Sequence, residues 1–123
     1  MPFTPQQVEV FAHEWIEAWN GRDRPQALSH YTDDFEMSSP FIVQIASEPS
    51  GKLTGKEQIS AYWKAALQKH PNLHFDLLGT SVGASSLVIH YRTNFGRIAM
   101  EVLFLNEFGK CYRAAAHYQN LPA

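Results

Sequence analysis

Three polar residues in the C-terminal part of the sequence are best suited to chemistry: His90, Arg92 and Glu101. If Phe95-Gly96 forms a two-residue hairpin turn, the register places His90 directly opposite Glu101, with Cβ atoms about 5 Å apart. An imidazole beside a carboxylate can act as an acid/base pair, and an enclosed site would shift both pKa values. Arg92 can orient an anionic or carbonyl group. A purely structural cross-strand pair, with Arg92 at the rim, explains the pattern equally well.

The strands that would carry this trio belong to a predicted run of four antiparallel strands. Turn residues separate these strands, whose ranges are 73–82, 86–94, 97–106 and 110–119. In the predicted register, one face of the central hairpin carries Val88, His90, Arg92, Ala99, Glu101, Leu103 and Leu105. The other face is largely apolar, which predicts a partner surface there. It carries Ile89, Tyr91, Thr93, Ile98, Met100, Val102 and Phe104.

Two helices are expected before residue 35. The first has a capping box formed by Thr4 and Gln7, with Pro5 at the first helical position. It is expected to stop at Asn20-Gly21, where Gly21 can take the left-handed conformation. The second is short, begins near Pro25 and is broken by the two aspartates 33 and 34.

A third helix follows a less regular stretch. Residues 35–46 have an extended pattern interrupted by Pro40, and residues 47–55 form a loop rich in Ser, Pro and Gly. The helix then carries apolar residues from Ile59 to Leu67 on one face and ends at His70-Pro71. Helices followed by an antiparallel sheet predict an α+β domain with the helices packed on one face of a curved sheet.

Composition narrows the functional classes. The 123 residues fit one domain, 1–123, with 45% hydrophobic and 18% charged residues. A net charge of −2 gives no basic surface for nucleic acid or a membrane. The lone Cys111 excludes an internal disulfide, and neither a signal peptide nor a membrane span is visible, so the cytoplasm is expected. No phosphate-loop, dinucleotide or metal-ligand pattern occurs, so no cofactor or metal is expected.

Five aromatic residues could line an internal cavity and offer it polar atoms. They are Trp15, Trp19, Trp63, Tyr112 and Tyr118. At helical spacing, each tryptophan alone is better explained as ordinary core. Three tryptophans in so short a chain nevertheless favour a pocket-lining role for at least one of them.

The order of these elements resembles the nuclear transport factor 2-like superfamily, and within it the SnoaL-like and ketosteroid isomerase-like group. The resemblance covers nearly the whole chain. The segments that carry it are WIEAWNGRD at 15–23, YTDDF at 31–35, GKLTGKEQISAYW at 51–63 and FLNEFGK at 104–110. Their order and spacing are specific for the fold and weak for function.

The resemblance implies a cone-shaped fold, in which a strongly curved sheet and the helices enclose a pocket for a small hydrophobic or polycyclic ligand. It also implies a homodimer formed through the outer face of the sheet. By this resemblance the last strand would line the pocket with Tyr112, Ala114, Ala116 and Tyr118, the alanines leaving room for a ligand. The complete predicted ligand-binding set is Trp15, Trp19, Met37, Ser39, Trp63, Arg92, Leu103, Tyr112, Ala114 and Tyr118.

Catalytic positions of the ketosteroid isomerases can be compared one by one. Their general-base aspartate corresponds to Ser39, and their tyrosine donor corresponds to Trp15. Their protonated aspartate corresponds to Glu101, eight residues before Gly109. One match in three argues against ketosteroid isomerisation and supports a functional carboxyl at Glu101.

Two functions remain open from the sequence. The first is acid/base catalysis of an isomerisation, cyclisation or dehydration, with Glu101 as the acid or base and His90 as its partner. The second is a non-catalytic ligand-binding or dimerisation module. The serine at the base position favours the second, and the predicted His90–Glu101 pair favours the first.

Overall fold

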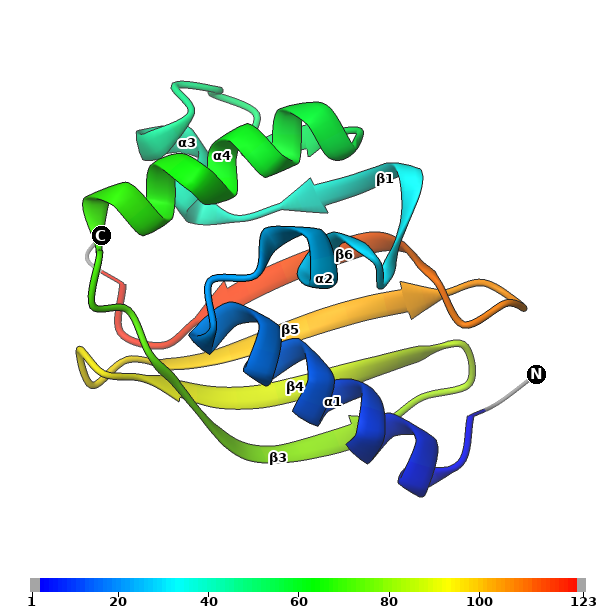
Figure 1. Ribbon diagram of the computed structural model, residues 1–123. Coiled ribbons are helices and arrows are strands. Elements are labelled where there is room, and N and C mark those ends of the chain that lie inside the picture. The colour runs from blue at the N-terminus through cyan, green and yellow to red at the C-terminus, as the bar shows by residue number, and fades with distance from the viewer. Residues whose placement is uncertain (1–2, 122–123) are drawn as a thin grey trace.

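The computed structural model describes residues 3–121 and has an α+β architecture, with helices packed on a six-stranded mixed sheet (Figure 1). The helices are α1 (Pro5–Asn20), α2 (Arg24–Leu28), α3 (Pro40–Ile45) and α4 (Lys56–Lys69). The strands are β1 (Tyr31–Ser38), β2 (Lys52–Thr54), β3 (Phe75–Val82), β4 (Ser86–Thr93), β5 (Ile98–Leu105) and β6 (Cys111–Tyr118). Their order in the sheet is β2-β1-β6-β5-β4-β3, and β1 and β6 are its parallel pair.

Helix α1 begins with the expected capping box. The Thr4 hydroxyl accepts a hydrogen bond from the Gln7 backbone amide at 3.1 Å, and the Gln7 side chain accepts one from the Thr4 amide at 2.8 Å. The predicted role of Gly21 is wrong, because Gly21 is right-handed and Arg22 takes the left-handed conformation, with φ 56°. Helix α1 packs against the sheet, and α4 lies alongside β1 (Figure 1).

The segment 35–46 differs most from its predicted extended structure, because part of it is helix α3. Ser39 caps this helix by accepting a hydrogen bond from the Phe41 amide at 3.2 Å, and Pro40 occupies the first turn. Both are standard helix-start signals that the short apolar run obscured. The second helix also ends before the two aspartates at 33 and 34, which lie inside β1, and the expected loop 47–55 contains β2.

The four C-terminal strands are confirmed to within about two residues, but the predicted β4–β5 register is wrong by one residue. His90 lies opposite Met100, and Glu101 lies opposite Ile89. The loop has three residues, 94–96, because the Thr93 amide donates to the Arg97 carbonyl at 2.8 Å and Gly96 adopts a left-handed φ of 81°. Such a glycine is typical of three-residue hairpin loops.

This single-residue shift moves every β4 side chain to the opposite face from the one predicted. The inner face, which packs against the helices, carries Leu87, Ile89, Tyr91, Thr93, Ala99, Glu101, Leu103 and Leu105. The outer face carries Val88, His90, Arg92, Ile98, Met100, Val102 and Phe104. The faces predicted for β5 are therefore confirmed, and those predicted for β4 are inverted.

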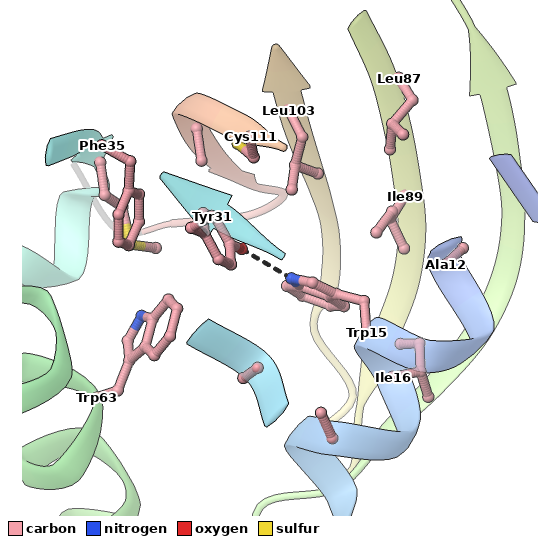
Figure 2. Packing of buried hydrophobic residues seen from close by; sticks show 14 of the residues in the cluster. Ala12, Trp15, Ile16, Tyr31, Phe35, Trp63, Leu87, Ile89, Leu103 and Cys111 are labelled. Atoms are coloured by element: carbon pink, nitrogen blue, oxygen red, sulfur yellow. Dashed lines mark hydrogen bonds between the residues drawn. The ribbon is translucent and has the colours of Figure 1, made fainter. Parts of the chain in front are cut away.

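The core lies between the inner face and the helices. Trp15 from α1 and Trp63 from α4 are both buried there, and Figure 2 shows them on either side of Tyr31. Leu103 and Ile89 on the sheet complete the packing around α1 (Figure 2). This core is predominantly aromatic near α4 and aliphatic near the N-terminal half of α1.

Candidate ligand-binding site

A cavity of about 250 Å³ lies between the inner face of the sheet and helices α1, α3 and α4. Its walls are mainly aromatic and aliphatic, with few polar groups. Six of the residues predicted to act in the site line it: Trp15, Trp19, Met37, Trp63, Glu101 and Tyr118. An apolar concave site with a small number of polar groups is typical of small-molecule binding, and this volume lies just below the usual range of about 300–1,000 Å³ for such sites.

Several predicted pocket residues do not line the cavity. Arg92 is exposed on the outer face, and Tyr112 is 44% exposed, so both pocket placements are wrong. Leu103 and Ala114 lie in the core without lining the cavity. Ser39 is buried without being part of the wall, and its hydroxyl caps α3.

The predicted His90–Glu101 pair does not exist, because the two side chains project from opposite faces of the sheet. On the outer face, the His90 Nε2 atom lies 3.0 Å from the Ser81 hydroxyl of β3. His90 therefore has a local polar partner on the outer face and cannot exchange a proton directly with Glu101.

Glu101 is the most unusual side chain in the cavity wall. It is only 2% exposed, and burial raises the pKa of its carboxyl to about 8. The Tyr91 hydroxyl lies within hydrogen-bonding reach and partly offsets this rise, because donation to a carboxylate favours the ionised form. The Glu101 Oε2 atom has no hydrogen-bond partner among the described residues. At pH 7 this group is therefore mostly a neutral carboxylic acid with unused hydrogen-bonding capacity.

Four tyrosines share the cavity wall with Glu101: Tyr31, Tyr62, Tyr91 and Tyr118. Burial is the main cause that raises the pKa of each hydroxyl, to about 12 for Tyr62 and well above the ordinary value for Tyr31 and Tyr91. These tyrosines therefore stay neutral near pH 7 and can donate or accept hydrogen bonds, but they are poor bases.

Local hydrogen bonds hold some of these hydroxyls in place. The Trp15 indole Nε1 donates to the Tyr31 hydroxyl at 2.9 Å, as Figure 2 shows. The Ser39 hydroxyl lies within hydrogen-bonding reach of both Tyr62 and Tyr118. The Trp15 indole N–H is therefore already used within the protein and is not free to donate to a ligand.

Two further donors lie beside the cavity. The Trp19 and Trp63 rings meet edge to face, with centroids 5.1 Å apart, and both line the cavity. Their indole Nε1 atoms are buried without a hydrogen-bond partner among the described residues. Buried polar atoms without partners are rare in folded proteins, and their concentration around one cavity supports a ligand-binding role.

Sequence reasoning missed Tyr31, Tyr62 and Tyr91. Tyr91 was missed because the hairpin register was off by one residue, and a three-residue loop with Gly96 would have placed it beside Ala99. Tyr62 was assigned only to a helix face, since helical spacing does not distinguish core from cavity wall. Tyr31 was assigned to a short helix that ends three residues earlier, at Leu28.

Neither a metal-ligand cluster nor a membrane-spanning helix is found in residues 3–121. Within that range, no group of three or more His, Cys, Asp or Glu side chains is arranged to hold a metal ion. Nor does any helix described there combine the length and apolarity needed to cross a membrane.

Sequence comparison places this chain in a known family. The sequence model of the SnoaL-like domain matches residues 12–117, so the chain belongs to the SnoaL-like domain family. The crystal structure of a SnoaL-like protein of unknown function from Burkholderia thailandensis is 50% identical, with a TM-score of 0.92. The match covers 98% of this chain and 100% of that one.

More distant structures share the fold. A protein provisionally named as an isomerase of the SnoaL-like family, from Agrobacterium tumefaciens, is 20% identical with a TM-score of 0.74, covering 94% of this chain and 99% of that one. A protein provisionally named as a polyketide cyclase, from Sinorhizobium meliloti, is 11% identical with a TM-score of 0.72, covering 94% and 100%. The comparison with curated proteins found no match.

Proposed function

We propose that this protein binds a small, mainly apolar molecule in the cavity, and that neutral Glu101 donates a hydrogen bond to a carbonyl or hydroxyl oxygen of that molecule. The unpartnered Oε2 atom of this buried carboxyl is the observation that carries the proposal. An apolar ligand would gain from burial against the aromatic walls. Its oxygen would supply the acceptor that a protonated Glu101 lacks within the described residues.

The same arrangement would suit acid catalysis of an isomerisation, cyclisation or dehydration. If the ligand oxygen gains negative charge during a reaction, a neutral carboxylic acid in a dry site stabilises that charge more strongly than it stabilises the ground state. The distant relatives with isomerase and cyclase names are consistent with such chemistry. In this proposal the helices and the inner face of the sheet would exclude water from the ligand.

A non-catalytic binding module is the second candidate, and Ser39 is the observation that favours it. By the family resemblance, Ser39 corresponds to the position where the isomerases keep a carboxylate base, and in the structure its hydroxyl caps α3. The neighbouring tyrosine hydroxyls have raised pKa values, so they do not replace the missing base. A protein of this kind would bind and release its ligand unchanged.

We further propose that a second copy of the chain covers the outer face of the sheet. Met100, Val102 and Phe104 project there as partly exposed apolar side chains on alternate positions of β5. A row of apolar side chains on an uncovered sheet face favours association.

The binding proposal can be tested with a neutral ketone, acetylnaphthalene, and with naphthalene itself as the probe without a carbonyl. Glu101→Leu removes the donor at similar volume, and we expect it to weaken ketone binding about tenfold, as a hydrogen bond worth about 1.4 kcal/mol would require. Naphthalene binding should change less than threefold. Glu101→Gln should retain ketone binding, because an amide still donates.

The pH dependence separates a donor from a shape effect. The ketone affinity of the wild-type protein should fall as the pH rises through about 8, where Glu101 ionises. The ketone affinity of the Glu101→Gln variant should stay constant over the same pH range. His90→Gln, a change on the outer face, serves as the matched control and should behave like wild type. Equal ketone affinity in the wild-type and Glu101→Leu proteins would contradict the proposal.

A further inference from the structure

Arg97 is a positively charged residue in the wall of this mainly apolar cavity. Its Nη1 atom donates to the backbone carbonyls of Gln119 at 3.2 Å and Asn120 at 3.4 Å. Its guanidinium carbon lies 5.9 Å from the centre of the Phe41 ring, within the range of a cation–π contact. The side chain is therefore held at one position, half-buried, instead of extending freely into solvent.

This arginine has no carboxylate partner among the described residues. The described residues form four side-chain ion pairs, and none of them involves Arg97. These pairs are His13–Glu9, Lys56–Asp33, His74–Asp76 and Arg113–Glu36. The carboxyl group in the cavity wall, Glu101, is mostly neutral at pH 7. The charge facing a ligand is therefore positive, in a protein whose net charge is −2.

Arg97 and Glu101 both line the cavity, Arg97 from the residue just before β5 and Glu101 from within that strand. They are four residues apart, so their side chains leave the strand on the same face, with α-carbons about 13 Å apart along an extended chain. Ala99 lies between them on that face and is buried beside Tyr91 and Tyr118, which themselves line the cavity. The β4–β5 turn beside Arg97 lies at the same end of the molecule as the C-terminus of α4 (Figure 1).

We infer that the ligand is a compact, mainly apolar carboxylic acid whose carboxylate binds Arg97 and whose far end presents a carbonyl oxygen to Glu101. This inference rests on the proposed function, since it names the chemical class bound at the same cavity. The planar guanidinium offers five donors, of which the structure uses those of Nη1, so the others can bind a carboxylate in a forked geometry. A half-buried ion pair of this kind adds to affinity, since the surrounding walls screen it less than solvent does.

The experiment compares two probes that differ in charge at one end. One is an acetylnaphthoate with its acetyl and carboxylate groups at opposite ends of the ring system, and the other is the matching primary carboxamide. Isothermal titration calorimetry at pH 7 should show the carboxylate binding about tenfold more tightly to the wild-type protein. Equal affinities in the wild-type protein would overturn the inference without any variant.

Variants identify the source of the preference. Arg97→Met keeps most of the stem and removes the charge, and it should abolish the carboxylate preference while changing carboxamide affinity less than threefold. Arg97→Lys should keep part of the preference. Arg92→Met is the matched control, because it makes the same charge change at the same hairpin on the outer, exposed face, and it should keep the full preference.

The outcomes separate this inference from the proposed function. If the carboxamide binds in a manner that depends on Glu101 but the carboxylate gains nothing, the inference is overturned and the proposed function stands. If neither probe binds, both are overturned. If Arg97→Met unfolds at a lower temperature yet keeps the preference, Arg97 serves only to hold the C-terminal end of β6, and the inference is again overturned.

Discussion

The two faces of the β4–β5 hairpin carry similar residue types in very different environments. On the inner face, Glu101 is buried beside tyrosines, and burial shifts the pKa of its carboxyl to about 8. On the outer face, His90 contacts the Ser81 hydroxyl and is partly exposed. The difference shows that burial and register decide which polar residue is available for chemistry, and that residue type alone does not.

The apolar residues of the hairpin show the same contrast. Leu103 is fully buried under the helices, whereas its neighbour Val102 is only partly buried on the outer face. Phe104, also on the outer face, has the Arg113 guanidinium 5.1 Å from its ring centre. The inner face therefore supports the cavity, and the outer face retains accessible apolar area.

The largest expected effect concerns Glu101 and pH. Its folded pKa of about 8 exceeds the ordinary value of 4.5, so the folded state holds a proton that the unfolded state releases between these pH values. Stability should therefore fall as the pH rises from about 4.5 to about 8, by as much as about 5 kcal/mol. Glu101→Gln should remove this loss and be the more stable protein at pH 9, as measured by urea unfolding across pH.

The control for this titration is Glu17→Gln, which changes an exposed carboxyl on α1. Its unfolding free energy should follow the wild-type curve across the same pH range. Parallel curves of unfolding free energy against pH for the wild-type and Glu101→Gln proteins would show that the Glu101 carboxyl is ionised in the folded protein. The inferred difference between the environments of the two faces would then be wrong.

A smaller effect compares two neighbours on β5. Leu103→Ala should lower the free energy of unfolding by about 3 kcal/mol, because it leaves a cavity in the core. Val102→Ala on the outer face should cost less than about 1 kcal/mol, because its side chain is only partly buried. Urea unfolding of dilute protein gives both values, and similar losses for the two variants would contradict the assignment of faces.

The smallest effect concerns the proposed dimer. Met100→Glu places a charge on the outer face and should weaken self-association at least tenfold in sedimentation equilibrium, since burying an unpaired charge is costly. Gln68→Glu adds the same charge at an exposed position of α4 and should leave association unchanged. An unaltered sedimentation profile for Met100→Glu would exclude this face as the contact between copies.

Much of the fold could be predicted because its signals are local. The capping box at Thr4 and the alternation in β5 each depend on adjacent residues, and both are confirmed. The hairpin register depends on whether Gly96 takes the left-handed conformation, which the sequence permits without requiring. Choosing a two-residue turn was enough to invert β4 and to pair Glu101 with His90.

The site was partly predictable for the same reason. Glu101 was identified by a hairpin argument whose β4 register was wrong, and separately by the family resemblance, which did not depend on β4. The tyrosines around it come from β1, α4, β4 and β6, so only the assembled fold brings them together. The role of Arg97 was not predicted, because its contacts with Phe41 and with the carbonyls of Gln119 and Asn120 form only in the assembled fold.

The titration of the Glu101 carboxyl is the most direct test of this site. Carbon-13 NMR of protein labelled at glutamate side chains would follow it, with the Glu101→Gln spectrum identifying the resonance. We expect a single transition with a midpoint near pH 8. A midpoint near the ordinary value of 4.5 would show an ionised carboxylate at neutral pH and would contradict the proposed hydrogen-bond donor.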